Sequence, residues 1–261
     1  MQIVKTLLVL SAASVSSSLA AEYRVDFRDG NFDNRQLRLI GAGSSGLVKP
    51  GPSGLLTSVP AGVDIKEVGF TTKCLIKGDF EITASYEILG LAPPTSGYGV
   101  GACIHLVAVS KEEHAATLSR LKRVEEGDVY AAHTAWYADG GKREHLLRLF
   151  HTKADFGKLR LVRIGNTLEY SVADEKSEEF RQLRRVAFTD ADVELVRVSV
   201  NRNGARSAAS VLWKDFTIRA AEISDLPRRS SGPGLLFWGI CVLAVTGAVL
   251  GARYWRRRTS G

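Results

Sequence analysis

The sequence has few cysteines, and this scarcity excludes the small exported proteins that depend on disulfide bonds. Only three cysteines occur among 261 residues, too few for a disulfide framework. Apolar residues make up 45% and charged residues 24% of the chain, a mixture typical of globular proteins rather than of disordered or collagen-like chains. The chain is therefore long and apolar enough to bury a core without disulfide bonds.

A concentrated basic surface is also lacking, although the net charge is +7. The excess positive charge lies towards the two ends of the chain, on Lys5, Arg228, Arg229, Arg253, Arg256, Arg257 and Arg258. Without these residues the middle of the chain is electrically balanced, and its basic residues are scattered among acids. Because nucleic-acid-binding proteins carry a basic patch or stripe, we expect no nucleic-acid partner.

Residues 1–21 have the pattern of a secretory signal peptide. One positive charge, Lys5, precedes a short apolar stretch, and small residues follow at Ser18 and Ala20. These features are typical of a cleaved signal. The alternative, an N-terminal membrane anchor, is disfavoured because the stretch is too short and too rich in serine. The mature protein is expected to begin at Ala21 or Glu22 and to be exported.

A second apolar segment, residues 234–252, is expected to cross a membrane. It holds 19 residues without a charge, and as a helix it would span about 29 Å, the hydrocarbon thickness of a bilayer. Residues 225–233 form a linker before it, and residues 253–261 form a short basic tail after it. The positive-inside rule then predicts a single-pass protein with an exported main domain and a cytoplasmic C-terminus.

Two alternatives for this segment stay open. The first is a helix buried in a core, which the uninterrupted apolar run and the following arginines disfavour. The second is a bacterial C-terminal sorting signal, in which the helix is removed after export. Leu226-Pro227 matches the start of a sortase motif, but the Thr-Gly end of that motif is missing. The sequence does not decide whether the helix is retained.

Residues 22–224 alternate between apolar and polar side chains with the period of two that indicates β-strands. The clearest example is Phe80, Ile82 and Ala84, which alternate with polar residues after a predicted turn at 77–79. Turn signals occur at Gly165-Asn166 and at Asn203-Gly204. The predicted strands are 23–27, 68–76, 80–88, 98–109, 129–137, 145–151, 159–164, 167–172, 193–200 and 209–219. This spacing predicts one all-β antiparallel sandwich or barrel.

One segment departs from this alternation and predicts a short surface helix. Ser110-Lys111-Glu112-Glu113 has the spacing of a capping box, with serine at the cap and glutamate three residues later. Leu118, Leu121 and Val124 then follow at helical spacing. We therefore expect a helix over residues 111–124.

Four segments resemble an uncharacterised family of exported bacterial domains with the concanavalin A-like lectin/glucanase fold. They are Gly69-Phe70-Thr71-Thr72-Lys73, Lys77-Gly78-Asp79-Phe80-Glu81-Ile82, the segment 93–101 (PPTSGYGVG) and the segment 209–220 (ASVLWKDFTIRA). The resemblance covers about residues 22–221 and implies a jelly roll of two curved antiparallel sheets. It implies no assigned activity, since a fold does not fix a function.

The motifs of common enzyme classes are absent from the sequence. Glycosidases of this fold need two flanking carboxylates, which one strand supplies best as Glu-x-Asp-x-Glu, and no such triplet occurs. Asp79/Glu81 and Asp192/Glu194 have the right spacing, but each pair lies where a turn meets a strand. The five histidines have no metal-ligand spacing, and P-loop, dinucleotide and Gly-x-Ser-x-Gly motifs are missing.

Cofactors and disulfide bonds are not expected in the main domain. A calcium site is compatible with the fold class, but no acidic loop is dense enough to propose one. Export permits a disulfide between Cys74 and Cys103. Alternation places these two thiols on opposite sides of the sheet, because Cys74 falls with Phe70 and Ile76 whereas Cys103 falls opposite Ile104. Two free thiols are therefore favoured.

The function favoured by the sequence is binding, with a glycan or a cell-envelope protein as the partner. Aromatic rings stack on sugars and polar side chains fix sugar hydroxyls, which selects the candidate ligand-binding residues Tyr98, His105, His133, Trp136 and Arg148. The protein is thus interpreted as a membrane-anchored extracytoplasmic binding module. The alternatives are a divergent glycan-processing enzyme and a structural envelope protein without a small ligand.

Overall fold

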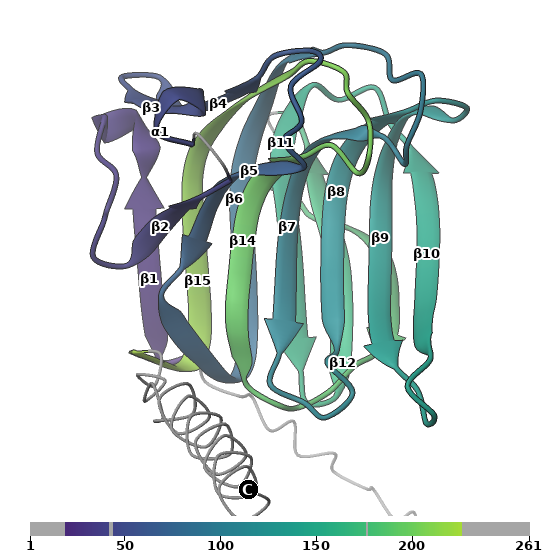
Figure 1. Cartoon of the computed structure of the whole chain (residues 1–261). Helices are drawn as coiled ribbons and strands as arrows, with labels where there is room; N and C mark the ends of the chain where they lie inside the picture. The colour runs from purple at the N-terminus through teal and green to yellow at the C-terminus, as the bar shows by residue number, and fades with distance from the viewer. Residues whose placement is uncertain (1–18, 42–43, 176, 226–261) are drawn as a thin grey trace, which may run out of the picture. The chain divides into compact units, whose positions relative to one another are not determined.

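The computed structural model describes residues 19–41, 44–175 and 177–225, and Figure 1 shows how their strands are arranged. Fifteen strands account for most of these residues. The other regular elements described are one turn of α-helix, α1 (Ser44–Leu47), and a 3-10 helix (Phe27–Asp29). The predicted all-β fold class is confirmed, and every strand pair is antiparallel.

The strands form two layers that face each other (Figure 1). The layer that we call the front sheet has the order β2 (Leu37–Ile40), β5 (Glu67–Thr72), β14 (Val193–Asn201), β7 (Val100–Ala108), β8 (Ala115–Arg123), β9 (Gly127–Tyr137) and β10 (Arg143–His151).

The back sheet has at its centre β15 (Ala209–Asp225) paired with β6 (Cys74–Leu91). On one side β6 is followed by β11 (Phe156–Ile164), β12 (Thr167–Asp174) and β13 (Arg181–Ala187). On the other side β15 pairs with β1 (Ala21–Asp26) and β4 (Gly54–Val59), and β4 pairs with β3 (Val48–Gly51). The two sheets join where β14 pairs with the start of β6.

The core lies between the sheets and takes one face of each. Phe70 and Ile104 of the front sheet and Ile82 and Phe216 of the back sheet are fully buried. The rings of Phe70 and Phe216 meet edge to face across the interior, with centroids 5.5 Å apart, a favourable geometry for aromatic pairs. Because residues alternate along a strand, the outer face of the front sheet is left for other roles.

The predicted helix over 111–124 is wrong. Ser110 does not cap a helix, because its Oγ accepts a hydrogen bond from the backbone of His114 within a turn, at 3.1 Å. Glu113 has a φ of 46°, which no right-handed helix accommodates. The following residues form β8 between β7 and β9. Hydrogen bonding of β8 to a strand on each side therefore outweighs the helical spacing of its leucines. Tertiary contacts commonly override local preference in this way.

The turn predicted at 77–79 is also wrong, because β6 runs without interruption through these residues. Gly78 has a φ of 66°, and the register with β15 shifts between Ala220 and Glu222. The glycine therefore permits a β-bulge inside a long strand. The turns at Gly165-Asn166 and Asn203-Gly204 are confirmed, since the first joins β11 to β12 and the second lies between β14 and β15.

Both cysteines of the described chain are free and buried, as the alternation predicts. Cys74 belongs to the main core, whereas Cys103 lies on the outer side of the front sheet. In residues 19–41, 44–175 and 177–225 no helix is long and apolar enough to cross a membrane. The predicted membrane segment 234–252, the tail 253–261, residues 1–18 of the predicted signal and nearly all of the linker lie outside the described residues.

Candidate functional site

The outer face of the front sheet contains a row of small side chains. Ser199, Cys103, Ser119 and Ala131 are register neighbours across β14, β7, β8 and β9. All four are buried, although they lie on the face that points away from the core. Larger side chains on either side of the row must shield them from solvent. Two members of the row, Ser119 and Ala131, line a hollow on this face.

This hollow, which we call the front groove, has a volume of about 640 Å³, within the range of pockets that hold small ligands. Hydroxyl, amide and imidazole groups make up much of its lining. The lining residues are Tyr98, His105, Thr117, Ser119, Leu121, Arg123, Ala131, His133, His145, Leu147, Asn201 and Asn203.

A pair of imidazoles forms one side of the front groove. His133 on β9 and His145 on β10 place Nε2 and Nδ1 3.0 Å apart, and their rings are nearly parallel, at 11°. Burial lowers the pKa of His133, and the nearby His145 and Arg143 lower it further. One imidazole therefore donates a hydrogen bond to the other, and the remaining ring nitrogens are left for solvent or a ligand.

A third histidine lies at the centre of the sheet. His105 on β7 makes a hydrogen bond of 2.9 Å between Nδ1 and Oγ1 of Thr117 on β8. Burial lowers its pKa to about 4, with further lowering by Arg197, His133 and Arg143. His105 is therefore neutral at ordinary pH and can offer both a donor and an acceptor.

An exposed tyrosine marks the opposite end of the front groove. Tyr98 is 66% exposed, and the guanidinium of Arg123 lies 5.6 Å from its ring centre. The backbone N–H of Tyr98 donates to Asn203, and the side-chain amide of Asn203 donates to the carbonyl of Gly99. These bonds fix the loop before β7 and present a flat aromatic surface to solvent.

The structure brings together three of the five candidate ligand-binding residues: Tyr98, His105 and His133. Trp136 lies on the opposite side of β9, where it stacks with His114 at a centroid distance of 6.4 Å. Arg148 of β10 pairs in register with Ala132, which is part of the core, so its side chain also points away from the front groove.

Several lining residues were not anticipated from the sequence, chiefly Thr117, Ser119, His145, Asn201 and Asn203. Thr117 and Ser119 were assigned to a helix, which hid their alternation. Alternation along β10 could have placed His145 on the same face as Leu147. Only the register between β9 and β10 places it beside His133. Asn203 was read as a turn residue, and it is one.

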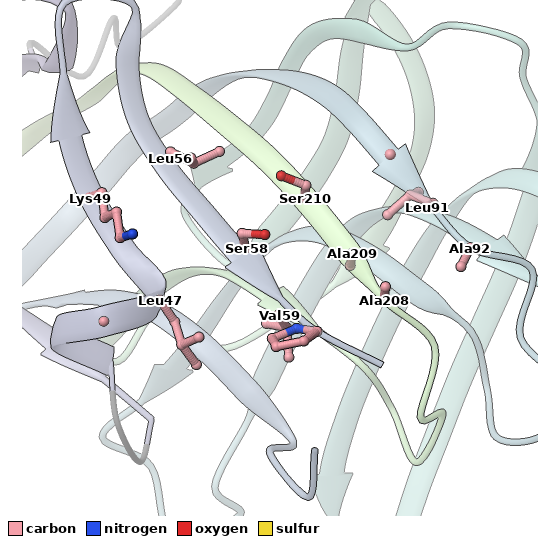
Figure 2. Close-up of a pocket in the computed structure, with 13 residues that line it drawn as sticks. Leu47, Lys49, Leu56, Ser58, Val59, Leu91, Ala92, Ala208, Ala209 and Ser210 are labelled. Carbon is pink, nitrogen blue, oxygen red and sulfur yellow. The ribbon is translucent and has the colours of Figure 1, made fainter. Parts of the chain in front are cut away.

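Two further hollows differ from the front groove in chemistry. The first, of about 670 Å³, lies beside the paired strands β4 and β15, and Leu47, Leu56, Val59 and Leu91 surround much of it in Figure 2. Its polar side chains are few: Lys49, Ser58 and Ser210. A site that orients a ligand needs convergent polar groups, and this hollow has fewer of them than the front groove.

The second, of about 580 Å³, lies on the outer side of the back sheet. Three of the four carboxylates that line it, those of Glu87, Glu178 and Asp215, are already engaged within the protein. Asp215 accepts a 2.8 Å hydrogen bond from Ser85, and Glu87 forms a 2.7 Å ion pair with Lys214. These contacts compete with any ligand for the same groups.

Carboxylates contribute little to the front groove. None of its described lining residues is Asp or Glu. Glu67, on β5 beyond the groove edge, accepts a 2.7 Å hydrogen bond from Ser199 and pairs with Arg197 at 3.1 Å. Of the carboxylates considered from the sequence, Asp79 accepts from the backbone of Gly165 at 2.7 Å and so holds a turn. The groove therefore presents hydrogen-bonding groups rather than a carboxylate pair.

No cofactor is implied by these groups. Across the described part of the chain, no three His, Cys, Asp or Glu side chains come together as metal ligands. Among the histidines of that part, His133 and His145 form a hydrogen-bonded pair, and two imidazoles are too few for a metal site of three ligands.

Comparisons with known structures define the class of fold. The chain is similar to LamAcat from Zobellia galactanivorans, with a TM-score of 0.55, 10% identity, and coverage of 76% of this chain and 96% of that one. A β-1,3-1,4-glucanase (lichenase) from a mouse hindgut metagenome also gives 0.55, at 8% identity and coverage of 77% and 99%. A legume lectin-like domain from Entamoeba histolytica gives 0.50, at 12% identity and coverage of 71% and 90%.

The protein therefore has the concanavalin A-like fold shared by glycosidases and lectins. Its sequence matches the family described as "Protein of unknown function (DUF1583) C domain" over residues 6–233, so the chain belongs to that family. No protein among the curated sequences matches it. At these identities the structural likenesses establish the fold alone.

Proposed function

We propose that this protein is a glycan-binding module and that its ligand occupies the front groove. The observation that carries the proposal is the lining itself. Imidazole, hydroxyl and amide groups converge beside the apolar side chains of Leu121, Ala131 and Leu147, and an exposed tyrosine lies at one end. Sugars present hydroxyls that need such donors and acceptors, and their C–H faces pack on aromatic rings.

Leu121 and Ala131 give the lining of the front groove the apolar component that sugar faces need. Leu121, Val129 and Ala131 form a small buried cluster with Leu149, separate from the main core. The structural relatives include a glucanase and a legume lectin-like domain, and this adds general support by analogy with the fold.

We further propose that the module is exported and tethered to a membrane, and the support for this lies in the sequence alone. The apolar segment 234–252 and its basic tail provide a single-pass anchor, and residues 1–21 provide a signal. In cells the full chain should sediment with membranes and resist salt extraction, and a variant ending at residue 233 should be released. Equal behaviour of the two forms would refute the tether.

The binding proposal is tested with the full chain on an array of defined oligosaccharides. Binding to at least one sugar class is expected, and His133→Ala or Thr117→Val should weaken it roughly tenfold, the effect of about 1.4 kcal/mol. Trp136→Ala serves as the control, because it removes a large ring from the opposite side of β9. Binding that is lost in the control but kept in both groove variants would place the site elsewhere. No binding by folded protein would refute the proposal.

A further inference from the structure

The front groove has an uneven distribution of charge. The outward positions of β7, β8, β9 and β10 carry six basic or imidazole side chains: His105, Arg123, His133, Arg143, His145 and His151. The only two acids of these four strands are Asp128 and Glu144, and both occupy positions of the opposite face. The face that holds the groove is thus basic, although the sequence as a whole shows no basic patch.

Arg143 supplies a positive charge that no carboxylate neutralises in the described chain. Its guanidinium lies 4.8 Å from the ring centre of Tyr137, its register partner on β9. It is exposed and lies two residues before His145, on the same face. By contrast, Arg123 at the other end of the groove pairs with Glu126 at 2.8 Å. The uncompensated charge is therefore beside the histidine pair.

The positive groups on this face lower the pKa values of His105 and His133. Burial is the main cause of the low pKa of both His105 and His133, and in each case the remaining causes are positive neighbours. For His133 these are His145 and Arg143, and for His105 they are Arg197, His133 and Arg143. A site with a positive potential of this kind favours an anion.

We propose that the front groove selects an acidic glycan, whose sugars carry carboxylate or sulfate groups, with the anionic group held by Arg143 and the His133–His145 pair. This inference rests on the proposed function and adds the class of ligand. Guanidinium and imidazolium groups form strong charge-assisted hydrogen bonds with carboxylate and sulfate oxygens. Leu121, Ala131 and Tyr98, which line the groove, then contact the uncharged parts of the sugar chain.

The same arrangement predicts how binding depends on pH. An anion beside His133 stabilises its protonated form, so binding takes up a proton and strengthens as the pH falls. The charged or titratable groups that face the pair are Arg143 from β10 and His105 from β7. His105 does not contribute above about pH 5, because its pKa is about 4.

Three oligosaccharides of equal length separate the alternatives when titrated calorimetrically into the full chain. They are an oligogalacturonate, a sulfated galactan fragment and a neutral β-glucan. We expect one or both acidic probes to bind at least roughly tenfold more tightly than the neutral one, by about 1.4 kcal/mol. The acidic probe that binds better identifies the carboxylate or the sulfate. Its affinity should rise between about pH 8 and about pH 5.5, the range in which imidazoles titrate.

Arg143→Gln and Arg148→Gln form a matched pair for this test. Both arginines are exposed residues of β10, neither has an ion-pair partner in the described chain, and they point to opposite faces. Arg143→Gln should weaken the acidic probe roughly tenfold, the scale of one charged hydrogen bond. Arg148→Gln removes the same charge and should change the affinity less than about twofold.

The outcomes also separate this inference from the proposed function. Tighter binding of the neutral glucan, lost in His133→Ala, would overturn the acidic ligand and leave the glycan-binding module standing. Equal losses in Arg143→Gln and Arg148→Gln would also overturn the inference, since general attraction would then explain the preference. Failure of all three probes to bind folded protein at either pH would count against both.

Discussion

His105 shows how a single buried imidazole connects the front groove to the stability of the fold. Its pKa is about 4 in the folded protein, mainly because of burial, and is close to 6.5 in an unfolded chain. Between these values the unfolded state binds more protons than the folded state. Above about pH 6.5, His105 is neutral in both states and does not lower the free energy of unfolding. As the pH decreases towards 4, protonation of the unfolded state lowers that free energy by at most about 3 kcal/mol.

Replacing His105 with glutamine should make the stability less dependent on pH. The free energy of unfolding, measured by urea denaturation at about pH 7.5 and about pH 4.5, should fall less in His105→Gln than in the unmodified protein. Thr117→Val is the control, because it removes the hydrogen-bond partner of His105 but keeps the imidazole. Its pH dependence should stay steep. An unchanged slope in His105→Gln would show that His105 does not titrate in this way.

At the residue scale, the sequence identified part of the site and missed the rest for one physical reason. Alternation correctly placed His105 on the face opposite Ile104, because the direction of a side chain in a strand depends only on local geometry. The contact between His133 and His145 depends on the register of two strands. Register is set by long-range pairing, so no local pattern could select these two histidines as neighbours.

At the scale of elements, the alternation identified most of the long strands but missed β8. The alternation of β6 is clear because its outer side is polar. In β8 both faces are largely buried, and small residues such as Ala116 and Ser119 weaken the alternation. The short strands β2 and β3 hold only four residues each, too few for a period to be evident.

The close approach of β7 and β8 below the front groove depends on Gly101. A Cβ added there would lie 2.0 Å from the carbonyl oxygen of Arg120, so the two central strands would have to separate. Gly101→Ala should cost about 1–3 kcal/mol, as overpacking does. Gly90→Ala is the matched control, since a Cβ at Gly90 meets no atom within 4 Å, and its cost should stay within about 0.5 kcal/mol. Thermal unfolding of both variants compares them, and equal costs would contradict the argument.

At the scale of the whole molecule, the two sheets bury one main core and leave the other face of the front sheet outside it. The topology explains how this happens. β14 pairs with β7 in the middle of the front sheet, and its first residue also pairs with β6 of the back sheet. The centre of the front sheet is therefore tied to both layers, so we expect it to open less readily than the strand ends.

The two buried cysteines allow a comparison between the centre of the front sheet and the end of β15. Burial raises the pKa of the Cys103 thiol to about 12, and the charge of Glu67 contributes. Its Sγ also lies 3.1 Å from Oγ of Ser199 at the centre of the front sheet. Cys74 is the first residue of β6 and pairs with Asp225, the last residue of β15. Reaction of a thiol needs exposure and ionisation, so the end of β15 must open for Cys74, and the sheet itself must open for Cys103.

In a Cys241→Ser variant, which leaves these two thiols, Cys74 should be alkylated first and Cys103 only at the rate of global unfolding. Time-resolved peptide mass mapping in low concentrations of urea measures both rates. The rate for Cys103 should rise with urea as steeply as global unfolding does, whereas the rate for Cys74 should depend on urea weakly, because fraying of a strand end exposes little surface. Equal rates with equal urea dependence would show that the end of β15 opens only with the whole domain. Faster labelling of Cys103 would show that the centre of the front sheet is the weaker part of the fold.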